Sequence, residues 1–85
     1  MSWMKVSFSQ TDVKAGKPQQ LVQDISLVYV GRPAPTEPVL FRTTGFSGVH
    51  DYFVTPEASS LAAQTLSAVG AKECTAPDRA SIELL

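Results

Sequence analysis

The hydrophobic pattern is clearest between Thr55 and Gly70, where apolar residues recur every three or four positions. This spacing places them on one side of an α-helix, and such a stripe faces the core. Thr55 suits the N-cap, Pro56 suits the first helical position, and Gly70 suits the residue that closes a helix. We therefore predict one helix over residues 55–70, with an apolar stripe of Ala58, Leu61, Ala62, Thr65, Leu66 and Val69.

The opposite side of this predicted helix is small and neutral. It carries Ser59, Ser60, Ala63, Gln64 and Ser67, without a charge between Glu57 and Lys72. A solvated helix face normally carries charged side chains. The pattern is compatible with a bland solvent-facing helix, and also with a surface that another chain approaches closely.

Alternation of apolar and polar residues predicts strands elsewhere in the chain. Residues 3–9, 39–44 and 49–54 alternate with a period of two, which is typical of half-buried strands. Residues 25–30, ISLVYV, are β-branched and aromatic, so we predict a central strand within 19–30. A helix beginning at Pro18 is the alternative for residues 19–24.

The segments between these elements carry turn and loop residues. Residues 10–18 are expected to form a turn region that reverses at Ala15-Gly16, with a short helix near Asp12 as an alternative. Three prolines place residues 32–38 in a loop, and residues 45–48 in a turn. Residues 79–85 are compatible with either a last strand or a tail.

These elements predict a single α+β domain over residues 1–85. Its antiparallel sheet has four to five strands with one helix packed on one face, in the order β-β-β-β-α-β. One helix covers only part of such a sheet. The second face is expected to be apolar and uncovered, and patches of that kind usually mark contacts. The residues assigned to it are Trp3, Val28, Val30, Leu40 and Tyr52.

Composition narrows the classes of function. With 44% hydrophobic and 18% charged residues, the chain resembles a globular protein. A net charge of −1 argues against binding nucleic acid through phosphate neutralisation. The single Cys74 excludes an intramolecular disulfide and fits a reducing compartment, so we expect a cytoplasmic protein. No segment is apolar for long enough to span a membrane.

One stretch, residues 45–51, invites a catalytic interpretation because it holds Ser47, His50 and Asp51 after a glycine turn. A nucleophile needs a base within reach, and the base needs an orienting group. On a strand, however, His50 and Asp51 point to opposite faces, so a hairpin turn is the better interpretation. His50 has no second histidine with which to share a metal ion, and we predict no metal, cofactor or catalytic residue.

The sequence therefore predicts a small non-enzymatic domain that acts by self-association, as a homodimer, or by docking on a protein partner. The predicted contact residues are Trp3, Tyr29, Tyr52, Ser60, Ala63, Gln64 and Ser67. The alternative is a small-ligand-binding domain with a pocket between helix and sheet, in which His50 and Arg42 supply polar contacts. The partner, the oligomeric state and the strand order stay open at this point.

Overall fold

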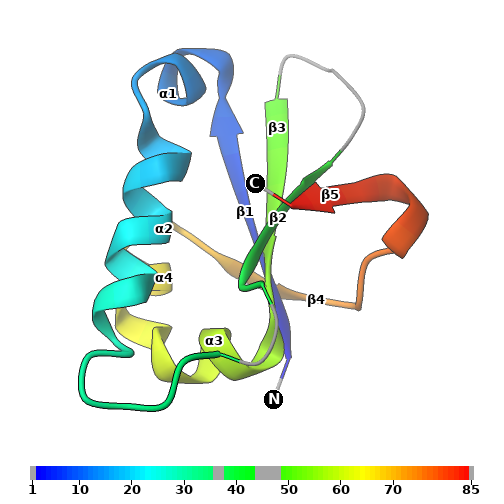
Figure 1. The fold of residues 1–85 in the computed structure, drawn as a ribbon. Helices are drawn as coiled ribbons and strands as arrows, with labels where there is room; N and C mark the ends of the chain where they lie inside the picture. The colour runs from blue at the N-terminus through cyan, green and yellow to red at the C-terminus, as the bar shows by residue number, and fades with distance from the viewer. Residues whose placement is uncertain (1, 36–37, 44–48, 85) are drawn as a thin grey trace.

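In the computed structural model, which describes residues 2–35, 38–43 and 49–84, a five-stranded antiparallel sheet carries helices on one face (Figure 1). The spatial order of the strands is β4-β1-β3-β2-β5. The strands are β1 (Trp3–Ser9), β2 (Leu40–Thr43), β3 (Val49–Val54), β4 (Lys72–Cys74) and β5 (Ile82–Leu84). The helices are α1 (Gln10–Lys14), α2 (Lys17–Leu27), α3 (Pro56–Leu61) and α4 (Ala63–Ala68), with a 3₁₀ turn η1 (Arg79–Ser81). The predicted α+β class and antiparallel sheet are confirmed.

The register of the central strands decides which residues enter the core. Val6 lies opposite Tyr52, and Val54 lies opposite both Met4 and Leu40. Because side chains alternate along a strand, these residues share the face that the helices cover. The buried cluster on this face is Val6, Phe8, Leu21, Ile25, Leu40, Tyr52, Val54, Ala58, Ala62 and Leu66. Leu40 and Tyr52 therefore belong to the core, and assigning them to the uncovered second face was wrong.

The predicted strand within residues 19–30 is wrong, because this segment forms α2 and the turns that follow it. Leu21 and Ile25 are spaced by four and are 2% and 0% exposed, so a helix buries both on the sheet. Gly16, with φ +82°, precedes the helix, and Pro18 lies in its first turn. The β propensity of residues 25–30 is overridden by this packing. The alternative of a helix at residues 19–24 is confirmed.

The predicted helix over residues 55–70 forms, but as two short helices instead of one. The break lies at Ala62, whose φ and ψ of −106° and 30° are not helical. Ala58, Ala62 and Leu66 face the core as predicted. Thr55 is the N-cap residue, yet its side chain makes no capping hydrogen bond. Gly70 adopts φ +74°, the left-handed conformation expected after the last turn.

The short helix near Asp12, given as the alternative for residues 10–18, is confirmed as α1. Ser9 begins this helix, and its Oγ accepts a hydrogen bond from the Asp12 N–H at 3.2 Å. Strand β4, in contrast, was not assigned from the sequence. Strand β4 pairs antiparallel with β1 and forms one edge of the sheet. Strand β5 confirms the last-strand interpretation over Ile82–Leu84, although Leu85 lies outside the described residues.

The segment of residues 75–81, here called the strap, crosses the sheet on the face opposite the helices (Figure 1). A crossing is required because β4 and β5 occupy opposite edges of the sheet. The guanidinium of Arg79 lies 5.5 Å from the ring centroid of Trp3 and 5.3 Å from that of Phe41. The second face, which the sequence predicted to be uncovered, is thus partly covered by the chain itself.

Candidate functional site

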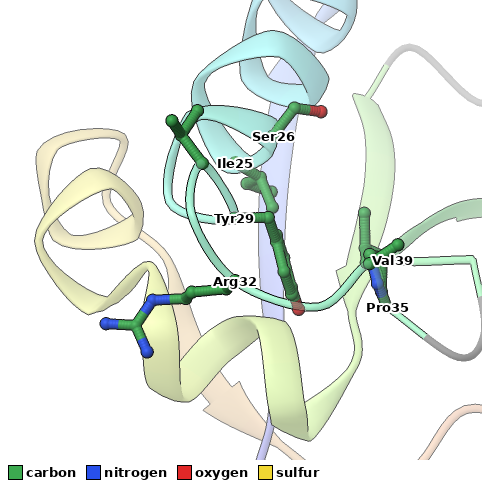
Figure 2. Close-up of a pocket in the computed structure, with 8 residues that line it drawn as sticks. Ile25, Ser26, Tyr29, Arg32, Pro35 and Val39 are labelled. Atoms are coloured by element: carbon green, nitrogen blue, oxygen red, sulfur yellow. The ribbon is translucent and has the colours of Figure 1, made fainter.

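A groove lies where α2 ends and the chain returns to the sheet. Helix α2 stops at Leu27, and turns lead to Gly31, whose φ is +79°. The Arg32 N–H donates to the Tyr29 carbonyl at 2.9 Å, which fixes the reversal. The proline-containing segment then runs back toward β2. The resulting cavity of about 270 Å³ is lined by Ile25, Ser26, Tyr29, Val30, Arg32, Ala34, Pro35 and Val39 (Figure 2).

Tyr29 supplies most of one wall of this groove. Its ring points from the end of α2 toward the loop that carries Arg32 and Pro35, while the Arg32 guanidinium turns away from it (Figure 2). The Tyr29 hydroxyl is buried and has no hydrogen-bond partner among the described residues. Burial raises the pKa of this hydroxyl, and the negative charge of Glu57 raises it further. The described residues therefore leave the hydrogen-bonding capacity of this buried hydroxyl unused.

Large apolar side chains stand exposed at this end of the helix. Val30, which lines the groove, is 77% exposed, and the neighbouring Leu27 is 68% exposed. Two other large apolar side chains are exposed in the described part of the chain, Leu84 and Val69, and both are less exposed than Leu27 and Val30. Single exposed apolar residues are ordinary, but two at the edge of an apolar groove form a contiguous surface. We call the surface formed by Leu27 and by the residues that line the cavity the α2 groove.

The aromatic predicted contact residues are distributed over three places. Tyr29 lies in the α2 groove. Trp3 is half-buried on the strap face, where its ring centroid lies 6.2 Å from that of Phe41. Tyr52 is 1% exposed and makes an edge contact with Phe8. Its place at a contact surface is therefore corrected, because the β3 register turns this ring into the core.

The predicted contact residues of α3 and α4 are all exposed, namely Ser60, Ala63, Gln64 and Ser67. Ser59, from the same predicted side, is instead 7% exposed, and its hydroxyl donates to the Val54 carbonyl at 3.2 Å. The break at Ala62 separates Ser60, on α3, from Ala63, Gln64 and Ser67, on α4. Ser60 lines a cavity of about 170 Å³ together with Ser2, Met4, Ser59 and Glu73, which is smaller than the α2 groove.

The residues predicted for a ligand pocket do not line the α2 groove. His50 is half-buried on the helix-covered face, opposite Phe8 of β1. The Arg42 Nε lies 2.6 Å from the Glu83 carboxylate, and both side chains are about half exposed. The groove is lined by the end of α2, the turns after it and the segment that leads to β2, and by no residue of a strand. The alternative of a pocket between helix and sheet therefore stays a prediction.

The catalytic interpretation of residues 45–51 gains no support from the geometry. Ser47 lies outside the described residues. Asp51 lies on the strap face, where its carboxylate accepts a hydrogen bond from the Ser7 hydroxyl at 2.6 Å. His50 faces the other way, as the period of the strand predicts. Over residues 2–35, 38–43 and 49–84, three or more potential metal ligands do not gather at any point.

Cys74 also stands apart from His50. It lies on β4 opposite Trp3, on the strap face and at the sheet edge. Burial raises the pKa of its thiol, although the Lys5 charge acts in the opposite direction. A raised pKa keeps the thiol protonated at neutral pH and lowers its nucleophilicity.

None of the helices in the described part of the chain is both long and apolar enough to cross a membrane.

Leu27 and Pro35 were not among the predicted contact residues. Val30 was assigned to the apolar second face of a predicted strand, which was expected to mark a contact, whereas the structure places it in a turn beside the groove. The available signal was the joint occurrence of an apolar helix end and a proline-rich return loop.

Comparison with known proteins gives no further information on this site, because no family description, curated protein or solved structure matches the chain.

Proposed function

We propose that this protein is a small non-enzymatic interaction domain that binds a protein partner through the α2 groove. The observation that carries the proposal is the exposure of Val30 and Leu27, 77% and 68%, beside an apolar cavity. Fully burying a side chain of this kind contributes roughly 1.5–3 kcal/mol. A partner that covers both residues gains this free energy, which the free chain leaves unused.

The size of the groove favours an anchoring side chain over a free small molecule. Small-molecule sites usually enclose about 300–1,000 Å³. The cavity here is about 270 Å³ and open at the rim formed by Val30. Protein interfaces commonly concentrate their binding energy in one or two large side chains that fill a pocket. One large apolar side chain of a partner suits this volume.

The remaining parts of the proposal follow from the same surface. The Tyr29 ring lines the cavity and offers an apolar surface to the anchor. The lone Cys74 thiol fits a reducing compartment, so we place the interaction in the cytoplasm. Self-association through this groove is a special case, in which the partner is a second copy.

The test is a photo-cross-linking amino acid placed at Val30 in cells of the native host. Gln23, exposed on the same helix but outside the groove, is the matched control position. A discrete adduct with one protein at Val30, absent at Gln23, supports the proposal. An adduct of twice the chain mass identifies a second copy as the partner. Equal adduct patterns at both positions, or none at Val30, contradict the proposal.

A small apolar ligand with one hydrogen-bond acceptor is the second candidate occupant. The observation that favours it is the buried, unpartnered hydroxyl of Tyr29. Short fatty acids and aromatic carboxylates are the probes to use, with the shift in melting temperature as the measurement. Stabilisation of the wild type but not of Val30→Asp supports this candidate. The absence of any shift on the wild type argues against it.

A further inference from the structure

The α2 groove carries an apolar projection and a cavity side by side. Leu27 is the last residue of α2, and the Val30 N–H donates a hydrogen bond to its carbonyl at 3.3 Å. A hydrogen bond between residues three apart places their side chains one above the other. Leu27 and Val30 therefore form one projection, 68% and 77% exposed. Because Val30 also lines the cavity, the projection adjoins the cavity directly.

This arrangement has the symmetry that a two-fold dimer requires. In such a dimer the same patch faces itself, so each contact between the copies occurs twice. A projection beside a cavity meets this condition, because the projection of each copy enters the cavity of the other. The cavity, of about 270 Å³, has apolar side chains in its wall, among them Ile25, Tyr29 and Val39. Two such insertions remove four exposed apolar side chains from water, two from each copy.

Two charged side chains beside the groove are self-complementary in the same sense. Arg32 lines the cavity and is exposed, and its guanidinium turns away from the Tyr29 ring (Figure 2). Glu57 is exposed in the first turn of α3, near enough for its charge to raise the pKa of the Tyr29 hydroxyl. Among the described residues, neither charged side chain forms an ion pair or a hydrogen bond. One charge of each sign is thus left for a partner.

From these features we infer that the partner of the α2 groove is a second copy of this chain, related to the first by a two-fold axis. The inference rests on the proposed function, because it uses the same groove. Leu27 of each copy enters the cavity of the other, and the two Val30 side chains meet near the axis. Arg32 of each copy pairs with Glu57 of the other. A foreign partner needs its own matching projection and charges, whereas a second copy has them by symmetry.

The first experiment tests the apolar projection. Light scattering over a wide range of concentrations should show the mass of the wild type rising to twice the 9.1 kDa of one chain. Leu27→Lys buries a charge in each of the two apolar cavities and should raise the dissociation constant of the dimer at least about 100-fold. Leu84→Lys, at a residue of β5 that is 59% exposed, is the matched control and should leave this constant unchanged.

The second experiment tests the charge pairs through a gain of binding, which misfolding does not imitate. Arg32→Glu and Glu57→Arg each place like charges opposite one another at both contacts, so each variant alone should dimerise about tenfold more weakly than the wild type. When the two variants are mixed, both contacts join opposite charges, and native mass spectrometry should show the heterodimer in excess. Arg42→Glu mixed with Glu83→Arg is the control, because these residues pair within one chain.

The outcomes separate this inference from the proposed function. A dimer that Leu27→Lys weakens, together with an excess of the Arg32→Glu and Glu57→Arg heterodimer, supports the inference. A monomer at all concentrations, a dimer that Leu27→Lys leaves unchanged, or statistical mixing of the two charge variants overturns it. A cross-link from Val30 to a different protein then still supports the proposed function. The absence of any adduct at Val30 contradicts both.

Discussion

The two faces of the sheet are covered in different ways. On one face, helices α2 and α4 bring Leu21, Ile25 and Leu66 onto Val6 and Tyr52 of the strands, and these residues are 0–2% exposed. On the other, a seven-residue strap crosses with a single cationic side chain over two rings. Apolar burial scales with the area removed from water, whereas one exposed cation–π contact is worth about 0.5–1 kcal/mol.

A sheet with apolar residues on both faces therefore does not need a layer of helices on each face. The helix-covered face supplies most of the stability, because it holds nearly all of the buried side chains. The strap face needs only enough attachment to shield Phe41, which is 8% exposed. The two faces thus differ in how much buried apolar surface holds them: much on the helix-covered face and little on the strap face. The predictions below test this division.

The largest expected effect is on the helix-covered face. Leu21→Ala removes a side chain that is 2% exposed in the core cluster. Such truncations cost about 2–5 kcal/mol, because a cavity remains. Urea denaturation followed by circular dichroism measures the free energy of unfolding. The control is Leu27→Ala on the same helix, where a 68% exposed side chain should cost under about 0.5 kcal/mol. Equal losses for the two variants contradict the division between the faces.

A smaller effect is expected on the strap face. Arg79→Ala removes the contacts with Trp3 and Phe41, and we expect a loss of about 1 kcal/mol in the free energy of unfolding. Trp3 is the chain's only tryptophan, so its fluorescence reports directly on the strap. Its quenching by acrylamide should rise while the far-ultraviolet circular dichroism stays unchanged. Arg32→Ala, an exposed arginine of the α2 groove, is the control and should not alter the quenching. Unaltered quenching in Arg79→Ala would show that the strap is held by other contacts.

The smallest effect concerns the α2 groove. Tyr29→Phe removes a buried hydroxyl that has no partner among the described residues, so the change should be neutral or stabilising by up to about 1 kcal/mol. Burial raises the pKa of Tyr29 above its usual 10.0. The hydroxyl therefore ionises less readily in the folded state than in the unfolded state. The free energy of unfolding stays constant in this respect below pH 10 and falls as the pH rises through the folded pKa.

The measurement is the free energy of unfolding at several pH values from 8 to 11. Tyr29→Phe should lose less stability than the wild type over the alkaline part of this range. Tyr52 keeps a raised pKa of its own, caused mainly by burial, so some alkaline loss should persist in the variant. A clear loss of stability in Tyr29→Phe at pH 7 would instead show that the hydroxyl has a partner in solution, such as a bound water.

Prediction from the sequence succeeded where the local pattern and the packing agree. The strand of residues 3–9 alternates cleanly, and Met4, Val6 and Phe8 face the helices as predicted. The stripe of Ala58, Ala62 and Leu66 was found because its period is helical. It failed at residues 25–30, where β propensity and helical spacing conflict. Spacing prevailed, since Leu21 and Ile25 bury together only on a helix.

The candidate site was predictable only in part, for a related reason. Tyr29 was chosen as a contact residue and does line the groove. Tyr52 looked equivalent in sequence, yet the pairing of β3 with β1 turns it inward. A one-residue change of register exchanges the two faces of a strand, and one sequence alone does not fix the register. The strap was likewise invisible until the edge positions of β4 and β5 were known.

Local sequence pattern was sufficient for the class of fold, the core stripe of α3 and α4 and the alternation of three strands, because these depend on neighbours within a few residues. The tertiary structure alone decided the order of the strands, the path of the strap across the second face and the exposure of Val30 beside the groove. Those features depend on which distant segments pair. Such pairing is settled by the packing of the whole chain rather than by any local pattern.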